Sequence, residues 1–184
     1  MEVVIRGENG DSLSDHKIGK VWCRGTSVMH SYFRDPEATE ACMVDGWLDT
    51  GDMGYMADGY LFIVGRAKDM IIINGKNHWP QDIEWAVEQL PGFNHGDIAA
   101  FSVETDNGEE APAVLVHCRV SDPAKRIELR DLIRDKVRSI TGMNCVVELV
   151  PPKSLPRTSS GKLSRAKAKK LYLSGEIEPF KLAA

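Results

Sequence analysis

The sequence lacks the features that mark metal-binding, secreted and membrane-spanning chains. Its four cysteines form no Cys-X-X-Cys pair, so neither a zinc site nor a disulfide framework is indicated. A reducing, cytoplasmic location fits that spacing. The first residues show no basic region followed by a long apolar stretch, so no signal peptide is expected. The longest apolar runs, such as residues 70–73, are far too short for a transmembrane segment.

Charge of one sign does not dominate, but its distribution is uneven. The 184 residues carry a formal net charge of -4, which gives no overall attraction to nucleic acid. From Lys153 to Lys170, however, seven basic residues occur without an acidic one. This run leaves open a module that binds nucleic acid or an acidic partner. Interleaved aromatic residues would favour such a module, but Tyr172 is the only aromatic residue near the run.

Residues 1–64 have the pattern of short strands separated by turns. Pro36 suits the start of a short helix within residues 33–43. Asp58 and Gly59 lie between apolar flanks and predict a β-hairpin. Strands without a second sheet or covering helices would leave an apolar face bare. We therefore interpret this segment as a piece of a larger domain.

The pattern changes after Gly65 to alternating strands and helices. The expected elements are a buried strand at 70–74, a helix from Pro80 to Leu90, strands at 97–104 and 111–120, a helix at 127–140, a strand at 145–150, and a helix from Ser164 to Tyr172. The helix at 127–140 is expected to have one apolar face, formed by Leu129, Leu132, Ile133, Val137 and Ile140. Together these elements predict an α+β fold, a small mixed sheet with three helices in a domain of roughly 115 residues.

The stretch "LPRTSSGKLSRAKAKK", residues 155–170, presents Lys162 before the last helix. A Walker phosphate loop would need glycine where Pro156 stands, and serine or threonine where Leu163 stands. The proline, glycine and small hydroxyl residues of this stretch instead predict a loose, solvated loop that packs into no core. Lys162 is either an ordinary solvated lysine or an ammonium delivered against developing negative charge.

Two further stretches carry candidate polar residues. Asp52 lies in a glycine-flanked turn, where its carboxylate could accept hydrogen bonds from two ribose hydroxyls or simply stabilise an Asx turn. Residues 65–69 contain Arg66, Lys68 and Asp69 between segments of different composition. A short charged joint of this kind is a candidate hinge, although a solvated run of charges explains the composition equally well.

Residues 75–79 offer a turn followed by two ring side chains. Gly75 and Asn77 suit a tight turn that lets a ligand approach the backbone. We favour a packing role for Trp79 over an aromatic wall of a site. His78 fits a structural histidine, because no second histidine or cysteine stands at metal-ligand spacing, and no metal site is expected.

Four stretches occur in an order that resembles the C-terminal third of the adenylate-forming superfamily, which includes acyl-CoA synthetases, luciferases and adenylation domains of nonribosomal peptide synthetases. They are "GTSVMHSYFRDPEATE" (25–40), "WLDTGD" (47–52), "GRAKDMIIINGKNHWPQDIE" (65–84) and "PRTSSGKLSR" (156–165). The segment "GKNHWPQDIE" (75–84) resembles fatty acyl-AMP ligases more than acyl-CoA synthetases. Acyl-CoA synthetases usually have a proline followed by Ser, Ala or Thr and then Glu-Ile-Glu, without the Asn-His pair.

The resemblance implies a role for five residues. Lys162 matches the lysine that contacts the carboxylate and the α-phosphate during adenylation. Asp52 resembles the aspartate that holds the ATP ribose hydroxyls, and Arg66 the arginine that reaches the ribose or phosphate region. Lys68 stands at the hinge position. Gly75 falls in the loop that lines the pantetheine path during thiol transfer.

The resemblance also implies a domain organisation. Residues 1–64 correspond to the end of a large N-terminal domain, 65–69 to the hinge and 70–184 to a mobile C-terminal domain that carries the catalytic lysine. The phosphate loop, adenine pocket and fatty-acid tunnel of the family are absent from this sequence. Most contacts to ATP and Mg²⁺ would be made there, so the chain alone is expected to be inactive.

The implied function is the activation of a fatty acid with ATP to an acyl-adenylate. The acyl group would then pass to the phosphopantetheine thiol of an acyl-carrier protein or of a polyketide synthase carrier domain. A long-chain fatty acyl-CoA synthetase, with CoA as the acceptor, is the near alternative. A nucleic-acid or acidic-partner module using residues 153–170 is the alternative of another class. The leading interpretation expects no nucleic-acid partner.

Overall fold

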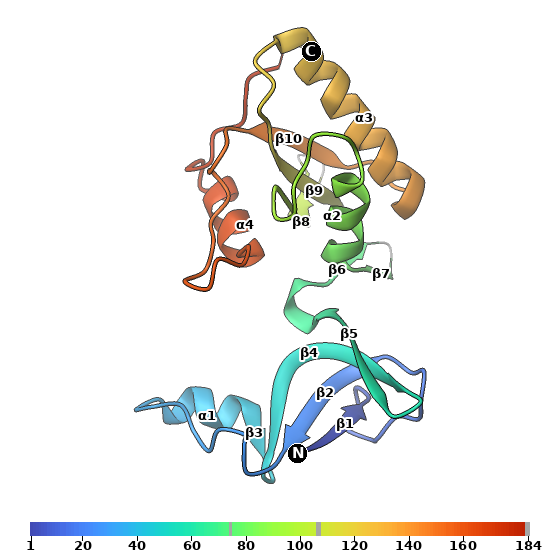
Figure 1. Cartoon of the computed structure of the whole chain (residues 1–184), viewed down its shortest axis with the longest axis vertical. Coiled ribbons are helices and arrows are strands. Elements are labelled where there is room, and N and C mark those ends of the chain that lie inside the picture. Colours follow the sequence, from blue (N-terminus) through green and yellow to red (C-terminus); the bar gives the residue numbers. More distant parts are fainter. Residues whose placement is uncertain (74, 106–107, 183–184) are drawn as a thin grey trace. The chain divides into compact units, whose positions relative to one another are not determined.

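The computed structural model describes residues 1–73, 75–105 and 108–182. The chain forms two compact units, Met1–Lys68 (unit 1) and Asp69–Ala184 (unit 2). Figure 1 labels the helices and strands of each unit. Each has its own sheet. No helix within the described residues is both long and apolar enough to cross a membrane.

Unit 1 is built on an antiparallel sheet. The order is β1-β2-β4-β3, and β5 also pairs with β4. The strands are β1 (Glu2–Arg6), β2 (Gly19–Arg24), β3 (Met43–Val44), β4 (Trp47–Ala57) and β5 (Tyr60–Arg66). Its α-helix, α1 (Pro36–Cys42), has the expected proline in its first turn, and the Asp35 carboxylate accepts a hydrogen bond from the Ala38 amide at 2.9 Å.

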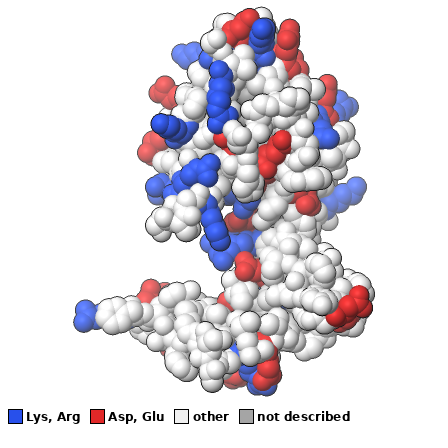
Figure 2. Space-filling model, viewed as in Figure 1, with Lys and Arg blue, Asp and Glu red and all other residues white. Residues whose placement is uncertain are grey.

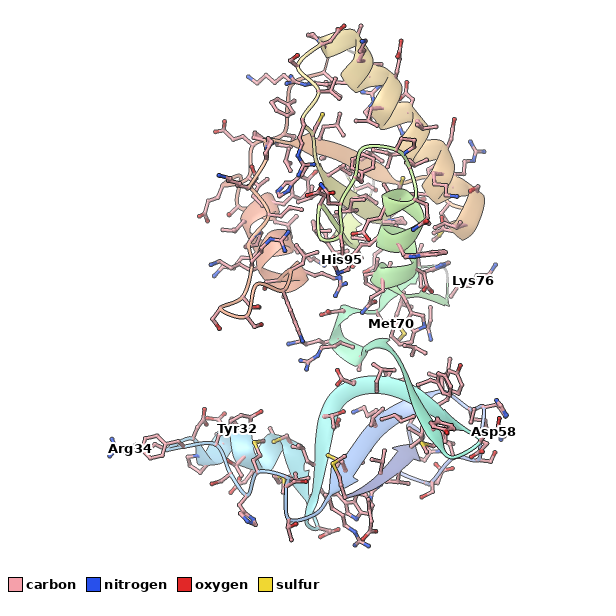
Figure 3. All side chains as sticks on the ribbon, in the orientation of Figure 1. Tyr32, Arg34, Asp58, Met70, Lys76 and His95 are labelled. Atoms are coloured by element: carbon pink, nitrogen blue, oxygen red, sulfur yellow. The ribbon has the colours of Figure 1, made fainter. Side chains whose placement is uncertain are left out.

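The β4–β5 hairpin confirms the expectation drawn from Asp58 and Gly59. Both residues have positive φ, 49° and 79°, as a two-residue type I′ turn requires. Figure 3 labels Asp58 at this turn. Beyond the turn, β5 exposes a run of large apolar side chains, including Tyr60, Phe62 and Ile63. This exposed run fits our interpretation of unit 1 as a piece of a larger domain.

The described residues of unit 2 confirm the α+β fold class, with a mixed three-stranded sheet, a separate two-stranded sheet and three α-helices. The sheet order is β10-β9-β8; β10 runs parallel to β9 and β8 antiparallel to it. The elements are β6 (Ile71–Ile73), β7 (Lys76–His78), α2 (Pro80–Glu88), β8 (Ile98–Glu104), β9 (Glu110–His117), α3 (Pro123–Thr141), β10 (Val146–Val150) and α4 (Arg165–Leu173).

The sheet of unit 2 separates two apolar cores. Alternate residues of a strand point to opposite faces. On one face Ile98 and Ala100 pack with buried residues of α2 and α3. On the other face Ala99 and Phe101 pack with Leu155 and with Ala168 of α4. Both faces of the sheet are therefore covered, which explains why β8 and β9 are apolar at nearly every position.

Helix α3 differs from the expected helix at 127–140. It begins at Pro123, because the Asp122 carboxylate accepts a hydrogen bond from the Ala124 amide at 2.9 Å and caps the first turn. Its apolar face is also narrower than expected: Leu132 and Ile140 are about half exposed. Only the residues nearest the middle of the face are fully buried.

Two short segments of the chain also differ from expectation. Of the strand expected at 70–74, residues 71–73 form β6, Met70 is outside the strand, and Asn74 lies outside the described residues. β6 pairs antiparallel with β7, a strand that was not expected. In the expected joint at 65–69, Gly65 and Arg66 belong to β5. Only Ala67–Asp69 leaves the strand, as a short 3₁₀ helix, η1. A hinge function for this joint stays a prediction.

Candidate functional site

Lys162 lies in a closed, hydrogen-bonded turn. The Thr158 amide donates to the Lys162 carbonyl at 2.8 Å, and the Gly161 amide donates to the Thr158 carbonyl at 2.9 Å. The Lys162 amide in turn donates to the Thr158 hydroxyl at 3.1 Å. Arg157 and Leu163 form an antiparallel bridge at the base of the turn. The expectation of a loose loop was therefore wrong; we call residues 155–164 the lysine turn.

The segment that contains the lysine turn also reaches the core. Leu155 is only 4% exposed and Ala168 is fully buried, and both belong to the apolar cluster on the α4 face of the sheet. The expectation that nothing in residues 155–170 packs into a core was thus wrong at these two positions. The two ends of the segment are fixed, and the turn between them projects to the surface.

The Lys162 side chain is exposed. Within the described residues its ammonium has no hydrogen-bond or ion-pair partner, so its charge is available to a ligand. The turn and α4 contribute the basic run noted in the sequence, and Figure 2 shows Lys and Arg side chains gathered on this side of unit 2. An anion would be attracted to this surface.

A buried histidine supports the start of the lysine turn. The Leu155 amide donates to His117 Nε2 at 3.0 Å, and His117 is 5% exposed at the end of β9. Its other ring nitrogen, Nδ1, lies 3.4 Å from the Asp97 carboxylate. Burial lowers the pKa of His117, and Asp97 opposes that shift. The neutral imidazole is the form that can accept the Leu155 hydrogen bond.

Asp97 is itself held by several donors. Arg119 forms a two-point pair with its carboxylate, at 2.6 and 3.0 Å, and the Asn94 amide donates to it at 3.0 Å. The guanidinium of Arg119, together with these other donors, lowers the pKa of Asp97 to about 2. Asp97 is therefore a carboxylate throughout the physiological range, fixed beside His117.

A buried ion pair supports the end of the lysine turn. Arg165 of α4 donates to both oxygens of Glu84 in α2, at 2.7 and 2.6 Å, and lies 3.5 Å from Asp69. Glu84 also accepts from the Ala100 amide of β8 at 3.0 Å. Burial raises the pKa of Glu84 while Arg165 opposes the rise, and pairing raises the pKa of Arg165. The short two-point contact identifies a charged pair.

In unit 1, the candidate residues Asp52 and Arg66 are brought together. They are direct partners in the β4–β5 register, and Arg66 Nε donates to Asp52 Oδ1 at 3.0 Å. The Asx turn considered for Asp52 belongs to Asp49, whose carboxylate accepts from the Gly51 amide at 2.9 Å. Asp52 is partly exposed and keeps acceptor capacity for a ligand hydroxyl. The nucleotide roles of both residues stay predictions.

The remaining candidates lie on exposed backbone. Lys68 is in η1 and is exposed. Gly75 has a φ of 70° in the β6–β7 connection, and a Cβ added there would meet open space, so the backbone conformation rather than crowding within the chain favours glycine. Figure 3 shows Lys76 on this hairpin. The hinge and pantetheine roles of Lys68 and Gly75 stay predictions.

His78 and Trp79 lie beside a small open pocket. Its lining consists of Asn77, His78, Trp79, Asp82, Ile83, Ile140 and Thr141. Trp79 is half-buried, precedes the first residue of α2 and lines this pocket, so the packing role favoured for it stays a prediction. Within the described ranges, no group of three or more histidine, cysteine or acidic side chains is placed to hold a metal ion.

These features define a small α+β unit with an exposed lysine on a braced turn, joined to a β-rich segment. The chain is 44% identical over 173 residues to a putative acyl-CoA synthetase of Caulobacter vibrioides, covering 93% of the chain. It is 34% identical over 175 residues to the long-chain-fatty-acid–AMP ligase FadD26 of Mycobacterium marinum, covering 85% of the chain. No family model matches.

A solved structure from a study of fatty acyl-adenylate ligases of E. coli and L. pneumophila is similar over 95% of the chain, with 41% identity and a TM-score of 0.84. The chain spans about 30% of the length of the two curated relatives and 31% of that structure. The chain is therefore homologous to the C-terminal portion of adenylate-forming ligases, which confirms the resemblance found in its motifs.

Proposed function

We propose that this chain is the C-terminal part of a fatty acyl-AMP ligase. The longer protein would activate a fatty acid with ATP, release pyrophosphate, and pass the acyl group from the adenylate to the thiol of an acyl-carrier protein. The observation that carries the proposal is the exposed Lys162 ammonium on its braced turn, in a chain whose relatives include a fatty-acid–AMP ligase.

The chemistry assigned to Lys162 is electrostatic. When a carboxylate attacks the α-phosphate, negative charge builds on the phosphoryl oxygens and on the departing pyrophosphate. A compact ammonium stabilises that charge in the transition state more than in the ground state, which is the condition for lowering the barrier. Because the Lys162 backbone is held by Thr158, the side chain extends from a fixed point.

Asp52 and Arg66 are assigned to the nucleotide. The Asp52 carboxylate would accept hydrogen bonds from the ribose hydroxyls, and the hydrogen bond that it accepts from Arg66 would orient it. We assign most contacts to ATP and Mg²⁺ to protein outside this chain. Lys68 would be the hinge residue, and Gly75 would lie along the pantetheine path.

The first test concerns the chain alone. Purified chain mixed with ATP, Mg²⁺ and fatty acids should give no acyl-adenylate above background, because the proposed nucleotide and fatty-acid pockets lie elsewhere. The measurement is detection of acyl-adenylate and pyrophosphate. Clear product formation by the chain would contradict the proposal that it is a catalytic part of a longer enzyme.

The second test concerns the acceptor. The longer enzyme should acylate a phosphopantetheinylated carrier protein and leave free CoA largely unmodified. Both acceptors present the same thiol, so discrimination must come from the rest of each acceptor or from a path closed to CoA. Parallel assays with the two acceptors, started from the same acyl-adenylate, measure the preference.

A long-chain acyl-CoA synthetase is the second candidate function. The 44% identical relative, described as a putative acyl-CoA synthetase, favours it. Efficient acyl-CoA production in the acceptor assay would move the assignment to this candidate. Transfer to the carrier protein alone would support the acyl-AMP ligase.

A further inference from the structure

We propose that His117, oriented by Asp97, is a positioning residue for Lys162. The inference rests on the proposed function for its catalytic consequence, but its structural basis is independent of it. His117 accepts the amide hydrogen bond of Leu155, the first residue of the lysine turn. It is a buried imidazole at the end of a largely apolar strand, and this acceptor role accounts for its presence there.

The hydrogen bond fixes the tautomer of the imidazole. Since Nε2 accepts from the Leu155 amide, the ring proton must lie on Nδ1, which faces the Asp97 carboxylate at 3.4 Å. The Asp97 carbonyl also accepts from the His117 amide at 2.8 Å. Asp97 thus holds both the backbone and the ring of His117 in the orientation that presents Nε2 to the turn.

Arg157 forms a second link between the lysine turn and the segment that contains Asp97. Arg157 donates from Nη2 to the Gly96 carbonyl and from Nη1 to the Gly161 carbonyl, both at 3.0 Å. Gly96 adjoins Asp97, so the residues that orient His117 also hold the far side of the turn. The first residue of the turn and the residue before Lys162 are therefore fixed to one support.

The support from His117 would affect catalysis by fixing the position of the Lys162 ammonium. A misplacement of about 1 Å can cost as much as a hundredfold in rate when a charge must meet a transition state. His117 touches no reacting atom in this account. Removing its acceptor would leave the buried Leu155 amide without a partner and favour other conformations of the turn.

Hydrogen exchange on the chain itself tests the structural part. His117→Leu should raise exchange of the turn amides in residues 155–163 by about tenfold or more, since the Leu155 amide loses its acceptor. In His117→Gln the side-chain carbonyl can replace Nε2 as the acceptor, so exchange should return toward that of the parent chain. His95→Leu, at a fully exposed histidine of the same unit, is the matched control and should change nothing in the turn.

The exchange results decide the inference without any activity measurement. Unchanged exchange of the turn in His117→Leu would overturn it. Equal rises in the leucine and glutamine variants would overturn it too, as would a rise spread evenly over unit 2, because each indicates a general loss of packing. A rise confined to the turn and reversed by glutamine supports it.

Acidification gives the same inference a second readout. The charged groups that face His117 are Asp97, Arg119 and Arg157, and burial lowers the histidine pKa. The neutral ring should therefore persist to below the ordinary histidine value of about 6.5, and the turn should open only as pH falls further. Corrected for intrinsic rates, turn exchange should rise in acid for the parent chain and stay flat in His117→Gln. A flat parent profile would count against the inference.

Activity of the longer enzyme then tests the catalytic consequence. His117→Leu should lower acyl-adenylate formation by up to about a hundredfold and leave thiol transfer from supplied acyl-adenylate near normal. Combined with Lys162→Ala, it should cause little further loss, because both changes act through one group. If Lys162→Ala alone had no effect, the proposed function would fail while the exchange result still stood.

Discussion

Replacing Lys162 with alanine in the longer enzyme should lower acyl-adenylate formation by about 10²–10³-fold, the usual loss when one preorganised charge-stabilising group is removed. The structure leaves this ammonium exposed while hydrogen bonds hold the backbone beneath it. Pyrophosphate release with saturating fatty acid and ATP measures the loss. Lys162→Arg should recover little of it, because a planar guanidinium is a poor substitute for a compact charge.

Lys167 is the matched control for this substitution. It is an exposed lysine of α4, close in sequence to the turn, and Lys167→Ala should leave adenylation nearly unchanged. Lys169 is a poorer control, because its ammonium donates to the Ser102 hydroxyl at 3.3 Å. A comparable loss in the Lys167 variant would indicate that the basic surface, rather than one lysine, is responsible.

Breaking the Glu84–Arg165 pair should have the largest effect on stability. Arg165→Met leaves the buried Glu84 carboxylate without its counter-charge, so the free energy of unfolding should fall by about 3 kcal/mol. Glu84→Leu should cost less, because Arg165 keeps its contact with Asp69 at 3.5 Å. Because Arg165 is still 19% exposed, we expect the lower end of the range for buried pairs. Urea denaturation of the chain, followed by a signal from unit 2, measures the change.

An exposed pair on the same unit provides the comparison. Arg134 and Asp131 lie 3.1 Å apart on α3 with both side chains more than 40% exposed, and Arg134→Met should cost less than about 1 kcal/mol. The double change Glu84→Leu with Arg165→Met should cost less than the sum of its parts, because neither member of the pair is left buried without the other. Additive losses would show that the two charges do not act as a pair.

Local patterns in the sequence were enough to predict most of the elements. The type I′ hairpin followed from Asp58 and Gly59, and the start of α2 from Pro80. The apolar runs at 97–104 and 111–120 predicted the strands β8 and β9. The start of α3 was missed because the weight was given to apolar spacing, whereas Asp122 and the following proline determine the first turn.

The support of the lysine turn could not be predicted from local pattern. Glu84 and Arg165 are 81 residues apart, and Leu155 and His117 are 38 residues apart. Glu84 lies within the expected helix from Pro80 to Leu90, but no local pattern shows that tertiary packing buries it against β8 and α4. The one available signal for His117 was a histidine within an apolar strand, where a buried polar ring needs a partner.

The candidate residues themselves came from their motifs. Asp52 and Arg66 lie in separate stretches of sequence, and their pairing follows from the β4–β5 register. For Lys162, the composition of the loop correctly predicted an exposed side chain, but it wrongly predicted a loose backbone. Glycine and serine there close a tight turn, with Thr158 accepting and donating hydrogen bonds across it.

The most direct measurement of the central claim is thiol transfer by the Lys162→Ala enzyme from supplied acyl-adenylate. Lys162 is assigned to the adenylation step alone, so transfer to the carrier protein should proceed at nearly the parent rate while adenylation by the same preparation falls by about 10²–10³-fold. Equal losses in the two half-reactions, or no loss in either, would contradict the assignment of Lys162 as the adenylation lysine.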